Sequence, residues 1–104
     1  MTEEKYILDA NGDPQPEPDS MKWAEWFEHH RDEKRVAVDY FGEVMVSTVF
    51  LGLDHNFLSE GDPILYEPMI FGGEHDQYQD RYRTKVEALE GHKRAVELVQ
   101  GLKS

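Results

Sequence analysis

Two pairs of adjacent Asp and His residues are the side chains in this sequence whose types could act together in chemistry. Two imidazoles and two carboxylates could bind a divalent cation. Each pair follows one of two long predicted strands. If those strands are antiparallel neighbours, their C-terminal ends lie at opposite ends of the sheet, which counts against a shared metal site. The candidate metal ligands are Asp54, His55, His75 and Asp76.

The loop motif Asp54, His55 and Asn56 also has a structural interpretation, which we favour. Asp and Asn side chains hydrogen-bond to nearby backbone and bend the chain. They would do so where it leaves the predicted strand 44–51. The segment 52–63 forms a long connection, of a length that is often functional in a compact domain.

His92 lies between Leu89 and Val96 on the apolar face of the predicted last helix, next to Gly91. A glycine inside a helix costs about 1 kcal/mol relative to alanine. Its presence therefore predicts close approach of another backbone or side chain, and His92 is predicted to be a packed, hydrogen-bonded residue. Nucleophilic catalysis has little support, because the chain has no cysteine and no serine in an elbow or triad-like setting.

The 104-residue chain has a formal net charge of −11, which is unevenly distributed. Residues 1–33 carry −7 and residues 34–71 carry −4, whereas residues 72–104 are neutral. Binding to a nucleic-acid backbone or to anionic lipid depends on Lys and Arg, so this charge disfavours both. The acidic part is predicted to present an interaction face that includes Glu25, Glu28 and Asp32.

The neutral last third contains a second candidate interaction surface, formed by tyrosines beside arginines. Tyr and Arg are enriched at protein interfaces. This aromatic and basic patch comprises Tyr78, Arg81 and Tyr82.

Two helices are predicted. Asp19 or Ser20 can cap a helix that runs to about Asp32, with an aromatic stripe of Trp23, Trp26, Phe27 and His30 on one face. Thr84 and Glu87 match a capping box that begins the last helix, which runs to about Leu102. Its predicted inner face comprises Val86, Leu89, His92, Val96 and Val99.

Alternating and continuous apolar runs predict strands at 5–9, 35–40, 44–51 and 64–71, of which 44–51 is central. The proline-containing segment 11–18 is predicted to be an irregular, partly extended connection. Pro68 cannot donate to a ladder, so its strand should be an edge or carry a bulge. The element order β-α-β-β-β-α predicts one α+β domain over residues 1–104. It has an antiparallel sheet of three to four strands and two helices packed on one face.

The compartment predicted from composition is the cytoplasm. The absence of cysteine fits a reducing environment, the acidic N-terminus does not resemble a signal peptide, and no apolar run reaches the ~20 residues of a membrane span. No cofactor is predicted.

Three stretches together carry a family resemblance: Trp23–Glu28, Val46–Phe57 and Tyr66–Gly73, with Gly91-His92 in the last helix. They resemble a widespread group of small uncharacterised proteins encoded by bacteriophages and prophages. The family has Thr at position 68 where this chain has Pro68, so the local strand geometry is expected to differ. The resemblance implies a phage setting, and a host cytoplasm, but no activity for any residue.

Three functional hypotheses follow. The first is a phage-type accessory protein that acts by protein–protein interaction, through an acidic surface that engages a basic, nucleic-acid-binding host protein, or through contact with another phage protein. The second is a small metal-binding protein or enzyme that uses the Asp and His residues of the loops. The third is a self-associating assembly component, in which a homodimer forms through the Pro68 strand or the aromatic stripe.

Overall fold

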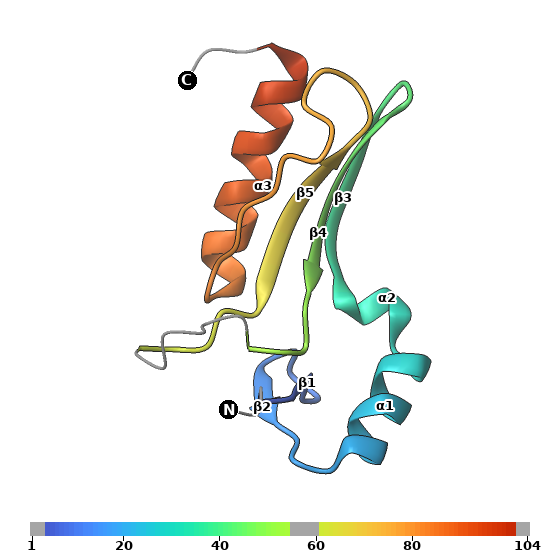
Figure 1. Ribbon diagram of the computed structural model, residues 1–104, viewed down its shortest axis with the longest axis vertical. Helices are drawn as coiled ribbons and strands as arrows, with labels where there is room; N and C mark the ends of the chain where they lie inside the picture. Colours follow the sequence, from blue (N-terminus) through green and yellow to red (C-terminus); the bar gives the residue numbers. More distant parts are fainter. Residues whose placement is uncertain (1–3, 55–60, 102–104) are drawn as a thin grey trace.

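The computed structural model describes residues 4–54 and 61–101. They form an α+β fold with two small antiparallel sheets (Figure 1). β1 (Tyr6–Leu8) pairs with β2 (Pro14–Pro16), and β3 (Arg35–Phe41), β4 (Val44–Phe50) and β5 (Tyr66–Phe71) form the second sheet in the order β3-β4-β5. The helices are α1 (Ser20–His29), α2 (Arg31–Lys34) and α3 (Lys85–Gln100). The predicted fold class and the central position of β4 are confirmed.

The three-stranded sheet is covered on one face. α3 packs along that face, where Val46, Ile70 and Ala95 form one buried cluster. α1 lies beyond one end of this sheet, beside β1 and β2 (Figure 1), where the rings of Trp26 and Phe27 contact Phe50 at the end of β4. α3 therefore buries the side of the sheet that carries the even-numbered residues of β4.

The segment 11–18 was predicted to be an irregular, partly extended connection, and its extended residues Pro14–Pro16 pair with β1 as β2. The ladder hydrogen bonds run from Glu17 N to Lys5 O and from Asp9 N to Asp13 O, each 2.8 Å long. Donor positions alternate along an antiparallel ladder, so Pro14 and Pro16 occupy positions from which no N–H is required. The prolines are therefore compatible with the strand.

Pro68 lies in an edge strand of the three-stranded sheet, as predicted, and pairs with Thr48 in regular register without a bulge. Its missing N–H is directed away from β4, towards residues 77–82. Residues 77–82 run alongside the free edge of β5 as an irregular segment. Isolated antiparallel bridges join Met69 to Gln79 and Tyr66 to Tyr82. The proline explains why this pairing does not become a continuous strand.

The predicted inner face of α3 was partly wrong. Val86 is 72 % exposed and Leu89 is 42 % exposed. His92 is buried and Val96 and Val99 pack against the cluster of Val46, Ile70 and Ala95, as predicted. The other buried residues of α3 are small, namely Ala88, Gly91 and Ala95. The capping box of Thr84 and Glu87 is present as predicted.

Candidate functional site

A chain of hydrogen bonds joins α3 to the sheet through His92. His92 Nδ1 lies 2.8 Å from Thr48 Oγ1, and His92 Nε2 lies 2.8 Å from Asp39 Oδ2. In the neutral imidazole that fits both contacts, Nε2–H donates to the carboxylate and Nδ1 accepts from the Thr48 hydroxyl. His92 is thus the packed, hydrogen-bonded residue that its position predicted. Its partners come from β3 and β4.

Hydroxyl, imidazole and carboxylate in this order are also the parts of a nucleophilic triad. A nucleophilic triad requires a hydroxyl that the substrate can reach, and here the solvent-accessible group is the carboxylate. Thr48 is completely buried beneath α3, whereas the Asp39 side chain is 53 % exposed. A substrate would meet the carboxylate and not the hydroxyl. The geometry therefore fits a structural link that fixes α3 on the sheet.

Gly91 confirms the close approach that the sequence predicted. A Cβ at this position would lie 2.7 Å from Cζ of Tyr82 and 2.8 Å from its hydroxyl oxygen. The neighbour is therefore the ring of Tyr82. His92, in contrast, bonds to Thr48 and Asp39.

The candidate metal ligands are divided between the two ends of the sheet. Asp54 lies beyond β4, where its Oδ1 accepts a hydrogen bond from Ile64 N at 2.9 Å. Asp76 lies beyond β5, where its Oδ1 accepts from Gly72 N at 2.6 Å. β4 and β5 are antiparallel, so roughly 20 Å of strand separates the two carboxylates. Each carboxylate closes its own turn.

His55 and Asn56 lie outside the described residues, so the loop motif is placed only at Asp54. His75 is half-buried in the turn with Asp76, where its carbonyl accepts from Tyr78 N. Within residues 4–54 and 61–101, no group of three or more His, Asp or Glu residues could hold a metal ion.

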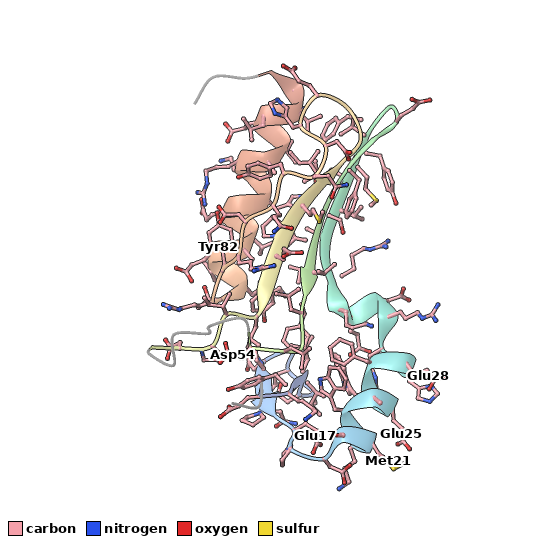
Figure 2. The ribbon with its side chains drawn as sticks, viewed as in Figure 1. Glu17, Met21, Glu25, Glu28, Asp54 and Tyr82 are labelled. Atoms are coloured by element: carbon pink, nitrogen blue, oxygen red, sulfur yellow. The ribbon has the colours of Figure 1, made fainter. Side chains whose placement is uncertain are left out.

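The acidic face predicted on the first helix is exposed. Glu25 and Glu28 lie on the side of α1 that points away from the sheet (Figure 2), and Asp32 is exposed on α2. In the described part of the chain, none of these three carboxylates forms an ion pair. The nearby Lys34 ammonium lies 4.4 Å from the ring centre of Phe27. Burial, and then the charge of Arg31, lower the Lys34 pKa.

The opposite side of α1 and its N-terminus make specific contacts. Asp19 caps it by accepting from Met21 N and Lys22 N. Trp23 Nε1 donates to Gly52 O at 3.1 Å, and the ring of Trp26 contacts Phe50. Glu25 and Glu28 therefore project from the side of α1 opposite these contacts, and Asp32 projects from α2.

The aromatic and basic patch does not form one surface. Tyr82 faces α3, where its hydroxyl donates to Asp80 at 2.8 Å and accepts from Arg94 at 2.7 Å (Figure 2). Burial, as the largest cause, raises the Tyr82 pKa. Tyr78 packs against the buried cluster at the other end of α3. Arg81 instead pairs with Glu67 at 2.9 Å, on the opposite face of the sheet.

One surface was not singled out from the sequence, namely the face of the sheet opposite α3. The signal was present, because both sides of the predicted strand 44–51 are largely apolar while both helices were placed on one face. Tyr40 and Phe71, at the ends of the neighbouring strands, are 64 % and 37 % exposed on that face.

Comparison with protein-family models, with curated proteins and with solved structures finds no match for this chain. Among the helices of the described residues, none is both long and apolar enough to cross a bilayer.

Proposed function

We propose that this protein is a phage-type accessory protein that binds a basic surface of a partner protein through the acidic face of Glu25, Glu28 and Asp32. The partner would be a host protein, with a nucleic-acid-binding groove as one such basic surface, or a second phage protein. The observation that carries the proposal is the display of three exposed carboxylates that have no cation partner among the described residues.

Charge and position both support this proposal. Surface carboxylates that are not neutralised within the chain produce a field that steers a cationic partner and increases the association rate. Residues 1–33 carry a net charge of −7, so this field is concentrated on one part of the chain. The resemblance to phage proteins supplies the expected setting.

The test compares two variants that remove the same charge. In the site variant, Glu25→Gln, Glu28→Gln and Asp32→Asn change the net charge from −11 to −8. The control variant makes the same change at exposed or half-buried positions in the neutral third, with Glu74→Gln, Glu90→Gln and Glu97→Gln. Both sets lie outside the hydrogen-bonded contacts of the described residues, so both variants should fold.

Each protein is immobilised and exposed to bacterial lysate at low and at high salt, and the captured proteins are identified by mass spectrometry. We expect the wild type and the control to retain the same basic protein at low salt, and to release it at high salt because screening weakens exposed charge contacts. The site variant should lose it. Equal capture by both variants would mean that net charge, and not this face, determines binding.

A further inference from the structure

Residues 13–18 have the sequence Asp-Pro-Gln-Pro-Glu-Pro, so that every residue is either a proline or the residue before one. Proline fixes its own φ at about −65°, and its ring excludes the preceding residue from the helical region. All six residues are therefore restricted to extended or polyproline II conformations. We call this stretch the proline segment. A partner that binds it in extended form loses little affinity to ordering of the chain, because the chain is already ordered.

The proline segment includes β2, which has a free edge. β1 is flanked by β2 on one side and by residues 52–54 on the other, because Tyr6 N donates to Gly52 O and Asp54 N donates to Glu4 O. No strand of the described residues pairs with the other edge of β2. All three residues of β2 are exposed. A partner can therefore reach both the proline rings and the backbone of this edge.

The free edge of β2 carries hydrogen-bond acceptors at two positions that have no donor. In an antiparallel ladder, every second residue exchanges its N–H and C=O with the partner strand. The ladder bonds to Lys5 O and from Asp9 N assign these positions to residues 13, 15 and 17. The carbonyls of Pro14 and Pro16 consequently point away from β1, about 7 Å apart. Within the described residues, no hydrogen bond reaches either carbonyl.

This pattern determines which kind of partner fits. A strand added to the edge would need N–H groups from β2, and Pro14 and Pro16 have none. The same reason opposes pairing between the β2 edges of two copies. The donors must therefore come from side chains, such as a Trp indole or a Tyr hydroxyl. Grooves lined by aromatic side chains are a recurrent means of binding extended, proline-rich segments.

We propose that the proline segment is the ligand of an aromatic-lined groove of a partner protein. Trp or Tyr side chains of the groove pack on the rings of Pro14 and Pro16 and donate to their carbonyls. Arg or Lys at the rim of the groove meets Asp13 and Glu17, in the part of the chain, residues 1–33, that carries a net charge of −7. The segment is separate from the acidic face on α1 and α2, so the inference does not rest on the proposed function.

The test is an NMR titration of the isotope-labelled full chain with two purified probes that contain aromatic proline-binding grooves, a WW domain and an SH3 domain. Proline has no N–H, so the amides of Asp13, Gln15 and Glu17 report on the segment. We expect saturable shifts at these amides with at least one probe. The variant Pro14→Val/Pro16→Val keeps apolar, strand-compatible side chains but removes both rings, and should weaken binding by at least about tenfold.

The matched control is Gln15→Thr, in the same strand. Side chains alternate along a strand, so Gln15 points to the face opposite Pro14 and Pro16, and its backbone pairs with Ile7. This variant should bind the probe as the wild type does. All substituted positions are exposed, so both variants should fold, which the dispersion of their NMR spectra checks directly.

Three results would overturn the inference. The first is the absence of shifts at residues 13–17 with both probes. The second is equal affinity of Pro14→Val/Pro16→Val and the wild type. The third is loss of probe binding in Glu25→Gln/Glu28→Gln/Asp32→Asn, which would place the contact on the acidic face and leave the proposed function standing. Binding that persists in that triple variant and is lost in the proline variant would support the inference, whether or not the acidic face binds a basic partner.

Discussion

The substitution Gly91→Ala tests the packing of α3 against Tyr82, because helix propensity and steric overlap with the ring have opposite effects on stability at this position. A Cβ here would lie 2.7 Å from Tyr82 Cζ and 2.8 Å from the hydroxyl oxygen. The ring is held in place, since its hydroxyl donates to Asp80 and accepts from Arg94, while its backbone pairs with Tyr66. Gly91→Ala therefore forces the ring or the helix to move.

Helix propensity alone predicts that Gly91→Ala increases the free energy of unfolding by about 1 kcal/mol. Overpacking costs about 1–3 kcal/mol, and weakening of the Tyr82 hydrogen bonds adds up to about 1 kcal/mol. The clash should prevail, so we expect Gly91→Ala to lower the free energy of unfolding by about 1–2 kcal/mol. In a Tyr82→Ala background the clash is absent, and the same substitution should instead stabilise by about 1 kcal/mol.

The free energy of unfolding is measured by urea denaturation for the wild type, both single variants and the double variant. The effect of Gly91→Ala should differ between the two backgrounds by a coupling energy of about 2–3 kcal/mol. Gly91→Ala should also lower the Tm by roughly 4–8 °C per kcal/mol. The reasoning is refuted if Gly91→Ala has the same sign in both backgrounds, because the contact with Tyr82 would then not be what requires glycine.

Two further predictions concern buried polar groups. Thr48→Val leaves Nδ1 of His92 without its buried partner and should lower the free energy of unfolding by about 1–3 kcal/mol in urea denaturation, whereas Thr48→Ser should restore most of it. Burial, followed by the hydrogen bond and charge of Glu4, raises the pKa of Tyr6 from 10.0 to about 12. This contribution is complete below pH 10 and is lost as the pH rises towards 12. Urea titrations across that range should show a steeper loss of stability for the wild type than for Tyr6→Phe, and parallel curves would contradict the assignment.

Much of the fold follows from local sequence signals. The apolar run after the Gly42 turn predicted the central strand, and the structure begins β4 at Val44. Thr84 and Glu87 predicted the start of α3 because a capping box satisfies two backbone donors at once. These signals predict the structure correctly because each depends only on residues that are close together in the sequence.

The failure on α3 depends on residues that lie far apart in the sequence. The face of α3 was predicted from the larger apolar residues, but the sheet accepts the small Ala88 and Ala95 because they allow close approach. The first predicted helix is interrupted at His30, where φ is −125° and ψ is 43°, and α2 begins after it. Neither outcome is encoded in hydrophobic periodicity.

For the candidate site too, properties that depend on nearby residues could be predicted, whereas contacts between distant residues could not. Burial of His92 followed from its position between apolar residues, but its partners Thr48 and Asp39 lie 44 and 53 residues away in the sequence. Exposure of Glu25 and Glu28 followed from the aromatic stripe on the opposite side of their helix. The exposed residues of the sheet face opposite α3 could be identified only from the strand register, which the assembled sheet provides.

The edges of the sheet also bear on how a partner is bound. An exposed edge strand invites addition of another strand, and charged side chains, bulges and proline oppose it. β5 contains Pro68 and is followed by residues 77–82. β3 begins with Arg35, has a register shift between Arg35 and Ala37, and carries Asp39 near its middle. Both edges therefore disfavour the addition of a strand from a partner protein.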